Sequence, residues 1–469
     1  MKALIASITF IIFVFALPAA GFSQSTLNLG YVIAPDEFSR FGVAVVNPQP
    51  ATADITFTLY GSVGEPVQTS TLKIPAGGQV SKLARELFPS AGTGGWIQAT
   101  SPVNGLRGFW LVGNFSTFAD GAEAAAAASE TVLPVITDQT ELALLNPGSD
   151  DAAVLIRLYG ANGQELAEPA VQVLPPKGSF RGRTTTLFSL LDWSAATHAR
   201  IVSGIPVVAS ATLINFQADP SLSAINAVST ATPLTEFAFP HVVLGTLGAS
   251  NYDTILGITN RSVSPQTVTL TFFPTDGSAS VDAQRILPGS GGLRTSARTL
   301  FPLPSSFQSG WVKVTAPLGA VGFAANADIQ QAGVTITAGA SSTQTNFIFG
   351  HIANLPPWWT GLALVNPGQS AASVEIFAIA PDGSLIGGAD NVASARIVIQ
   401  PGGKISRLLN EWIPQTQSRS TDGGFVFVRS SVPLYGLSEF FTRDLRVLSI
   451  VPGFDLAAGV TFAPPAPAR

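Results

Sequence analysis

Histidine is the side chain most often used for acid–base work at neutral pH. This chain has three, His198, His241 and His351, and no two are close in sequence. His241 and His351 share one position in related segments, FPH and FGH, which favours a structural role over a metal or acid–base role. There is no cysteine, which excludes thiolate ligands, a cysteine nucleophile and disulfide bonds.

Paired carboxylates could serve a glycoside hydrolase, but the acids that recur in this chain fall in turns. Asp276 and Asp382 share a hairpin-turn position, and Glu86 and Glu411 share another position, so turn and cap chemistry explains all four. The first two could contribute to a weak Ca²⁺ site, but the oxygen-rich cluster that Ca²⁺ requires is missing nearby. No GxSxG, HExxH or phosphate-loop motif is present. We therefore predict no catalytic residue, no metal and no cofactor.

Aromatic residues are the better candidates for a binding site. Trp358 and Trp359 follow a Leu-Pro-Pro segment and have no counterpart elsewhere in the chain. Adjacent strand residues face opposite ways, so one of these indoles can be exposed and can stack on a ligand such as a sugar. The alternative, which we favour, is that they pack against the preceding part of the chain. Trp96 and Trp311 share an equivalent position that opens a strand, and we expect them in a core.

These residues belong to an internal repeat with four copies. Each copy has an apolar run that ends in Asn, and the runs are FGVAVVNP, ELALLNPG, ILGITNRS and GLALVNPG. The four asparagines are Asn47, Asn146, Asn260 and Asn366, at spacings of 99, 114 and 106 residues. A glycine follows each of them by 17 residues, at Gly64, Gly163, Gly277 and Gly383. A propeller blade would repeat every ~40–50 residues, so each copy is long enough to be a separate domain.

Within each copy the pattern indicates antiparallel strands. The positions 8, 10 and 12 residues after the Asn are apolar in every copy, for example Ile55, Phe57 and Leu59. Period two predicts a strand with one buried face, and the glycine that follows suits a tight hairpin turn. A second Pro/Gly signal then introduces a short segment, for which we expect one or two helical turns or an irregular crossover.

About seven short strands in ~105 residues, with turn signals every 8–12 residues, are typical of a Greek-key β-sandwich. We predict an all-β protein of four tandem sandwich modules after a leader segment, with neighbouring modules abutting in a semi-rigid rod. The predicted ranges are 1–24 for the signal peptide and 25–131, 132–235, 236–345 and 346–469 for the modules, the last with a C-terminal tail.

The N-terminus has the layout of a secretory signal peptide. Lys2 precedes an apolar run from Ala3 to about Ala20 and then small residues. We expect cleavage between about residues 20 and 26 and a secreted or cell-surface protein. An uncleaved anchor remains the alternative, because the run approaches the ~20 residues that span a bilayer. No span is expected in the mature chain.

The string LALVNPG, the alternating strand, the DG-type turn, the PGG signal and a late GWV strand together resemble the immunoglobulin-like modules found in tandem in uncharacterised secreted bacterial proteins. The resemblance covers nearly all of the mature chain. The third copy departs from it, with Asn260-Arg261-Ser262 in place of Asn-Pro-Gly. What the resemblance implies is an extracellular or cell-surface role in binding, adhesion or spacing.

Composition narrows the function further. Charged residues are 11% of the 469, the formal net charge is −5, and there is no basic cluster, so a nucleic-acid partner is not expected. The leading hypothesis is a non-catalytic secreted or cell-surface array that acts as a scaffold, spacer or adhesion protein. The alternative is an adhesin with a specific aromatic site at Trp358 and Trp359 for an extracellular polysaccharide or another surface protein. A glycan-active enzyme is the least favoured class.

Overall fold

The computed structural model describes residues 24–190, 192–232, 234–328, 333–388, 396–418, 423–456 and 460–465. Apart from Gln24, the predicted signal peptide lies outside these ranges. The described chain is all-β, with antiparallel sheets, none of them closed, and short helices of a single turn. None of the described helices has the length and apolar character that crossing a membrane requires.

The strands form four groups, which we call modules 1 to 4 in chain order. In module 1, two four-stranded sheets pack face to face, with the orders β1-β6-β3-β4 and β5-β2-β7-β8. Its elements are β1 (Ser25–Ile33), η1 (Pro35–Glu37), β2 (Phe41–Val46), β3 (Ala53–Tyr60), β4 (Pro66–Ile74), β5 (Gln79–Leu83), α1 (Ala84–Leu87), β6 (Gly95–Ser101), β7 (Arg107–Gly113) and β8 (Ala119–Glu123).

Module 2 repeats this plan with one change, since a single long strand takes the place of β6 and β7. Strand β14 pairs with β11 and β9 through its first half and with β10 and β15 through its second half. The elements are β9 (Ala128–Leu133), β10 (Thr140–Leu145), β11 (Ala152–Gly160), β12 (Ala170–Leu174), β13 (Ser179–Arg183), α2 (Thr184–Leu187), η2 (Trp193–Ala195), β14 (Ala196–Ile214), β15 (Leu222–Asn226) and β16 (Val228–Ser229).

Modules 3 and 4 follow the same plan, and β31 spans both sheets of module 4 as β14 does in module 2. Module 3 has β17 (Glu236–Leu247), β18 (Ser250–Asn260), β19 (Gln266–Pro274), β20 (Val281–Leu287), β21 (Gly292–Ser296), α3 (Ala297–Leu300), β22 (Gln308–Thr315), β23 (Ala320–Asp328) and β24 (Gly333–Ala338). Module 4 has β25 (Gln344–Phe349), β26 (Trp358–Val365), β27 (Ala372–Ile379), β28 (Leu385–Gly388), β29 (Arg396–Ile399), β30 (Lys404–Leu408), α4 (Leu409–Trp412), α5 (Gln415–Ser418), β31 (Phe425–Thr442), β32 (Leu448–Pro452) and β33 (Phe454–Asp455).

The repeated Asn closes each sandwich with its side chain. All four are fully buried. In module 4, Asn366 Nδ2 donates to the carbonyl oxygens of Ser370 at 2.8 Å and Ile399 at 3.0 Å, and its Oδ1 accepts from Gly368 N. Asn260 makes the same bonds although Arg261-Ser262 follows it, so the third turn keeps the common geometry. The side-chain amide thus satisfies buried backbone groups where two strands end.

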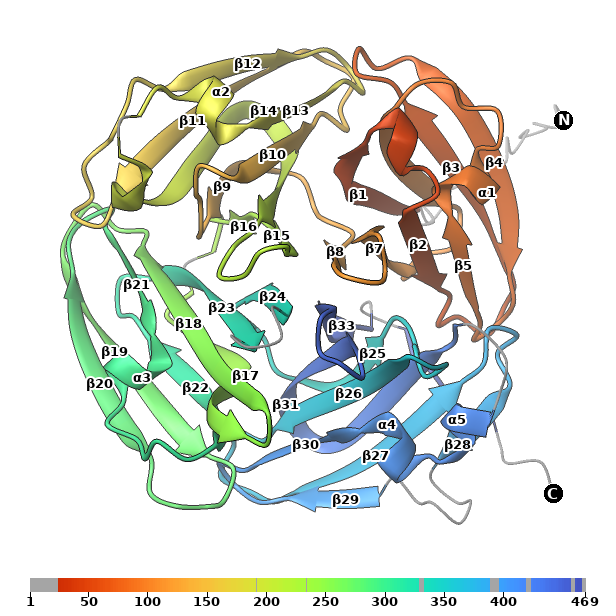
Figure 1. Cartoon of the computed structure of the whole chain (residues 1–469). Coiled ribbons are helices and arrows are strands. Elements are labelled where there is room, and N and C mark those ends of the chain that lie inside the picture. The colour runs from red at the N-terminus through yellow and green to blue at the C-terminus, as the bar shows by residue number, and fades with distance from the viewer. Residues whose placement is uncertain are drawn as a thin grey trace, which may run out of the picture.

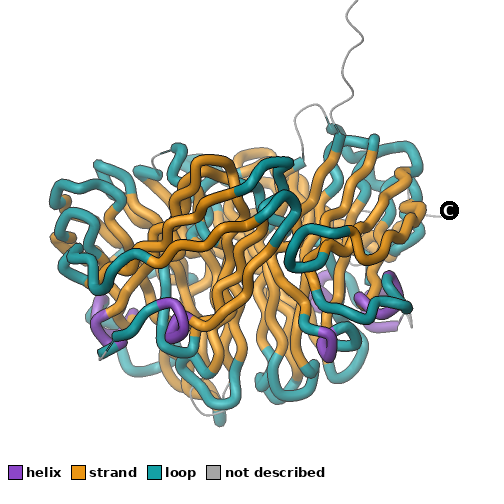
Figure 2. The backbone as a smooth tube through the Cα atoms, turned by 90° about the horizontal axis from the view of Figure 1, so that it is seen from above, coloured by secondary structure: helices purple, strands orange, loops and turns teal. Residues whose placement is uncertain are grey.

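The four modules close into a ring, so the expected rod is wrong (Figures 1 and 2). Module 4 returns to module 1, where Gln79 N donates to Pro381 O at 2.9 Å and Gly424 N donates to Gln79 Oε1 at 2.6 Å. The α-helices lie along one side of the ring (Figure 2). Turn and core patterns within a module carry no information on how modules are arranged, which is why the sequence did not predict closure.

One contact recurs at three of the four module interfaces. The turn of one module's β-hairpin accepts a backbone hydrogen bond from the residue after the next module's Pro-Gly turn. The three bonds are Ser179 N to Ser62 O, Gly292 N to Ala161 O and Gln79 N to Pro381 O. The interface of modules 3 and 4 lacks this bond within the described residues. There, a Cβ on Gly277 in the hairpin of module 3 would meet no atom within 4 Å.

Apolar clusters cross the interfaces, although the main clusters of modules 3 and 4 each lie within one module. The cluster of module 2 extends into module 3 through Phe323 and Ile336. Trp96 is buried as expected, but it lies between modules 1 and 2 and its Nε1 donates to Lys177 O at 2.7 Å. Trp311 is its counterpart between modules 3 and 4, where Nε1 donates to Gly402 O at 2.9 Å. The domain boundaries themselves remain predictions.

Candidate functional site

Four repeat-equivalent strands surround the ring axis: β8, β15, β24 and β32. Each is an inner strand of its module, and each packs against the corresponding strands of the two neighbouring modules. In sequence they are short segments, ADGAE, LSAIN, GVTITA and LSIVP. The axis of the ring is therefore the place where all four modules meet.

A layer of buried polar side chains lies on this axis. Its members are Asp120, Ser223, Thr335 and Ser449, one from each module and each at most 1% exposed. Asp120 Oδ2 accepts from Ala224 N at 3.0 Å and from Thr335 Oγ1 at 3.4 Å, and Oδ1 accepts from Gly121 N at 2.9 Å.

The Asp120 carboxyl thus bonds groups of modules 1, 2 and 3, and Ser449 of module 4 is the fourth member of the layer. Burial raises the pKa of Asp120 to about 8, against the lowering effect of these hydrogen bonds. At neutral pH the side chain is therefore mostly a neutral acid that links modules 1, 2 and 3 at the centre of the ring.

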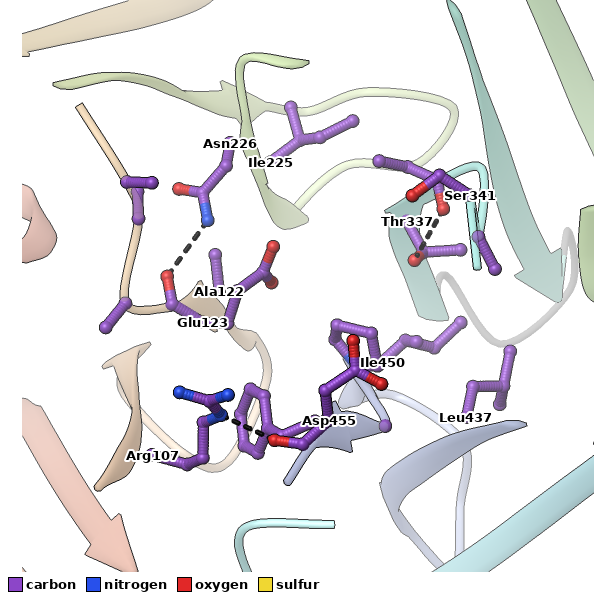
Figure 3. A pocket seen from close by; sticks show the side chains of 18 of the residues that line it. Arg107, Ala122, Glu123, Ile225, Asn226, Thr337, Ser341, Leu437, Ile450 and Asp455 are labelled. Carbon is purple, nitrogen blue, oxygen red and sulfur yellow. Dashed lines mark hydrogen bonds between the residues drawn. The ribbon is translucent and has the colours of Figure 1, made fainter. Parts of the chain in front are cut away.

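A pocket of about 650 Å³ adjoins this layer. Every module contributes to its lining (Figure 3). The labelled lining residues are Arg107, Ala122 and Glu123 from module 1, Ile225 and Asn226 from module 2, Thr337 and Ser341 from the end of module 3, and Leu437, Ile450 and Asp455 from module 4. We call this cavity the axial pocket.

Three charged groups line the axial pocket: Arg107, Glu123 and Asp455. Arg107 Nε donates to the Asp455 backbone oxygen at 2.7 Å, which ties module 1 to module 4. Burial raises the pKa of Glu123 and of Asp455 and lowers that of Arg107. Asn226 Nδ2 donates to Glu123 O at 2.9 Å and so fixes that strand against module 2. The pocket therefore offers donors and acceptors on a wall that also has aliphatic parts.

The axial pocket can form hydrogen bonds to a small polar molecule. The residues that line the axial pocket include no histidine or lysine that could act as a base beside a hydroxyl nucleophile. Among the described residues there is no group of three or more His, Asp or Glu side chains placed to hold a metal ion.

Trp358 and Trp359 lie in β26, away from the axial pocket, and both are half-buried. Trp358 packs against the cluster that joins module 4 to module 1, not against module 3 as expected. It also lines a separate cavity of about 250 Å³ with Leu111 and Phe440. Trp359 makes an edge contact with Phe441 at 5.9 Å and lies 5.3 Å from the Arg443 guanidinium. Whether this pair binds a ligand stays a prediction.

The histidines occupy structural positions. His198 is buried and stacks on Tyr159, and burial lowers its pKa to about 3. His241 and His351 lie at equivalent places between modules, the first beside Lys404 and the second beside Phe109. Asp276 and Asp382 each accept a hydrogen bond from the serine two residues on, which is the turn chemistry expected of them.

Sequence reasoning missed the axial residues. A polar side chain inside a short apolar strand, repeated in four modules, was the available signal. It was hard to find because Asp120, Ser223, Thr335 and Ser449 follow their module's Asn at unequal spacings. Loops of different length separate the two positions, so no fixed period relates the four residues.

No family model and no curated protein matches this chain. Among solved structures, a Thermotoga maritima protein numbered 1070 is 17% identical and matches 23% of this chain and 94% of its own, with a TM-score of 0.20. A tetra-tandem repeat from the extending region of a large adhesion protein is 13% identical and matches 93% and 100%, with a TM-score of 0.11. Bacteroides uniformis β-glucuronidase is 8% identical and matches 52% and 26%, with a TM-score of 0.13. At these scores the similarities carry no argument about function.

Proposed function

We propose that this chain is a non-catalytic binding protein, secreted or held at the cell surface, that takes a small polar ligand in the axial pocket. The proposal depends on one observation, which is that residues of all four modules form the wall of that pocket. That the modules are immunoglobulin-like is part of the same proposal. A cavity at the meeting point of several domains is a common place for a ligand site. Binding there would couple ligand affinity to ring closure.

A ring suits binding better than spacing. A spacer gains reach from modules joined end to end, whereas here module 4 folds back onto module 1. We place catalysis behind binding because the pocket wall brings no histidine or lysine beside its hydroxyl groups. Export to the cell exterior rests on the N-terminal sequence alone, and N-terminal sequencing of the mature protein tests it.

A neutral saccharide or similar polyol is the ligand class that we propose. Its hydroxyl groups can both donate and accept hydrogen bonds. The pocket wall offers partners of both kinds, because Arg107 donates, the Glu123 carboxylate accepts and the Asn226 amide does both. Apolar faces of a sugar ring can pack on Phe347 and Phe454, which also line the pocket.

Calorimetric titration of the mature chain with neutral mono- to trisaccharides tests the proposal. We expect at least one sugar to bind the unmodified protein, and Arg107→Gln or Glu123→Gln to weaken that binding about tenfold, because each removes a charge-assisted hydrogen bond. Glu168→Gln, an exposed position in module 2, is the matched control and should bind as the parent does. Equal affinity in all variants, or no binding of any sugar, would overturn the axial assignment.

The alternative is a site beside Trp358, favoured by the apolar cavity that this indole lines. If saccharide binding is lost in Trp358→Ala and kept in Arg107→Gln, this cavity replaces the axial pocket as the binding site.

A further inference from the structure

The interface between modules 3 and 4 differs from two of its three counterparts at one wall position. This position pairs across the sheet with the third residue before each repeated Asn. It is Arg181 at the interface of modules 1 and 2, Arg294 at that of modules 2 and 3, Ser406 at that of modules 3 and 4, and Ser81 at that of modules 4 and 1. Two interfaces therefore carry a guanidinium where the other two carry a short hydroxyl.

At the interface of modules 1 and 2, the Arg181 side chain occupies the crevice at this position. Its Nη1 lies 2.7 Å from Glu37 Oε2, and its Nη2 lies 2.7 Å from Glu141 Oε2. Its guanidinium also lies 4.7 Å from the centre of the Tyr31 ring. The crevice between modules 1 and 2 is thus a site for a planar cation, built from carboxylates and an aromatic face, and the chain supplies the cation itself.

At the interface of modules 3 and 4 the corresponding crevice is open. Ser406 is too short to fill it. The hairpin turn of module 3 does not contact module 4 at Gly277, where a Cβ would meet no atom within 4 Å. The result is a cavity of about 490 Å³. The equivalent cavity at the interface of modules 4 and 1, which also carries a serine, is about 220 Å³.

Glu439 distinguishes this crevice from the smaller one. It is half-buried in the crevice wall, paired across the sheet with Gly361, at the position where module 1 has Leu111. None of the groups that the structure describes donates a hydrogen bond to its carboxylate, and none forms an ion pair with it. Burial raises the pKa of Glu439 to about 7, while the charge of Lys404 acts in the opposite direction.

Lys404 does not neutralise Glu439 by direct contact, because its three N–H groups have other acceptors. Lys404 Nζ lies 2.7 Å from Gly310 O, 3.2 Å from Ser309 Oγ and 2.9 Å from His241 Nδ1. At the mouth of the crevice, Arg407 and Glu411 are exposed and of opposite sign. Glu439 is therefore the half-buried acidic group of the crevice wall, and among the described residues it has neither a hydrogen-bond donor nor an ion-pair partner.

The remaining wall is largely apolar and aromatic. Tyr252 and Phe307 come from module 3 and form an edge contact at 5.7 Å, and Phe441 comes from module 4. Leu362, Leu437 and Leu448 complete the apolar lining. A ligand that reaches Glu439 must therefore carry an apolar body behind its polar head.

We infer that the crevice between modules 3 and 4 binds a small organic cation, with an amidinium, guanidinium or amine head on Glu439 and an apolar body between Tyr252, Phe307 and Phe441. The head would take the place that Arg181 takes at the interface of modules 1 and 2. This site is separate from the axial pocket and stands whether or not that pocket binds a sugar.

Benzamidine and its neutral analogue benzamide test this inference by calorimetry or ligand-observed NMR on the mature chain. We expect benzamidine to bind at least about tenfold more tightly than benzamide, because the two differ mainly in charge. Glu439→Gln should remove that difference while leaving the melting temperature close to that of the parent. Equal binding of the two probes, or a benzamidine affinity unchanged by Glu439→Gln, would overturn the inference.

Two further variants localise the site. Ser406→Arg introduces the residue found at the filled interface, and we expect it to compete with benzamidine by occupying the crevice. Glu411→Gln removes the carboxylate at the mouth and should leave benzamidine binding unchanged. Loss of binding in Glu411→Gln with retention in Glu439→Gln would place the cation at the mouth and contradict the assignment.

Discussion

At the scale of single residues, the most consequential side chain is Asp120. It is an acid buried at the meeting point of four modules, and groups from modules 1, 2 and 3 donate hydrogen bonds to it. Because its pKa in the folded protein is raised to about 8, above its ordinary value of 3.8, the folded state binds a proton that the unfolded state releases. Its contribution to stability is thus complete below about pH 4 and is lost as the pH rises through 8.

We therefore predict that Asp120 makes the ring less stable as pH rises from 5 to 9, by at most about 1.4 kcal/mol per pH unit. Asp120→Asn should remove this part of the pH dependence, because the amide resembles the neutral acid in shape and hydrogen bonding. Melting temperatures measured at several pH values for both proteins check this. Parallel curves for parent and variant would mean that Asp120 is already ionised in the folded protein.

The paired tryptophans lead to a second prediction at this scale. Trp358→Ala removes a half-buried indole that packs on the cluster joining modules 4 and 1, and should cost less than the ~3–5 kcal/mol of unfolding free energy that a fully buried tryptophan costs. Trp359→Ala removes a half-buried ring held by Phe441 and Arg443 and should cost clearly less. Chemical denaturation of both variants checks the order. A larger loss in Trp359→Ala would show that its contacts, and not the packing of Trp358, hold this end of β26.

Residue patterns predicted more about structure than about the site. The repeated Asn, the hairpin glycines and the alternating apolar positions were found from sequence, because each serves its own module. Asp120 and Glu439 were not found, because their importance depends on which modules face each other. A residue whose partners lie more than 100 positions away leaves no local pattern.

At the scale of elements, the hairpin between the third and fourth strands of a module has two tasks. It reverses the chain at a glycine with positive φ, and at three interfaces it docks on the next module. Gly163 and Gly277 allow the two tasks to be distinguished. Their φ values are nearly the same, 82° and 79°, but only the hairpin of Gly163 docks on the next module. A Cβ on Gly163 would overlap Gly289 O of module 3, whereas a Cβ on Gly277 meets nothing within 4 Å.

Replacing either glycine with alanine should cost about 1–2 kcal/mol from backbone strain alone. Gly163→Ala should cost more than Gly277→Ala, because it also forces modules 2 and 3 apart. Differential scanning calorimetry of the two variants measures the difference directly. Equal losses would show that the docked hairpin contributes little to the interface.

Strand and turn elements were largely predictable, and their assembly was not. The all-β class followed from period-two runs and Pro/Gly turns, and the short helices appear as single turns where a crossover was expected. The ring depends on bonds such as Gln79 N to Pro381 O, which join ends of the chain about 300 residues apart. Nothing in the turn that precedes Gln79 distinguishes it from the same turn in a rod.

At the scale of the whole molecule, ring closure predicts a compact particle. The scaling of compact folds gives a radius of gyration of about 23 Å for a chain of this length, well below that of four modules in a row. Small-angle scattering of the mature protein checks this. A markedly larger radius, with the profile of an extended particle, would contradict closure in solution.

Apolar packing between modules also predicts coupled unfolding. Ile376→Asp places an unpaired charge in the core of module 4, at a cost of several kcal/mol. Because module 4 is packed against modules 1 and 3, we expect one transition at lower temperature, instead of the loss of a single module. Calorimetry that shows a transition at the parent temperature beside a new, lower one would mean that the modules unfold independently.

The interface between modules 4 and 1 uses the same backbone bond as two interfaces within the continuous chain. Module 1 recognises module 4 without a peptide link between them, so the covalent connection is not what specifies a neighbour. The position of the chain ends is then interchangeable among the four junctions. A circular permutant that begins with module 2 and ends with module 1 has every contact it needs to rebuild the same ring.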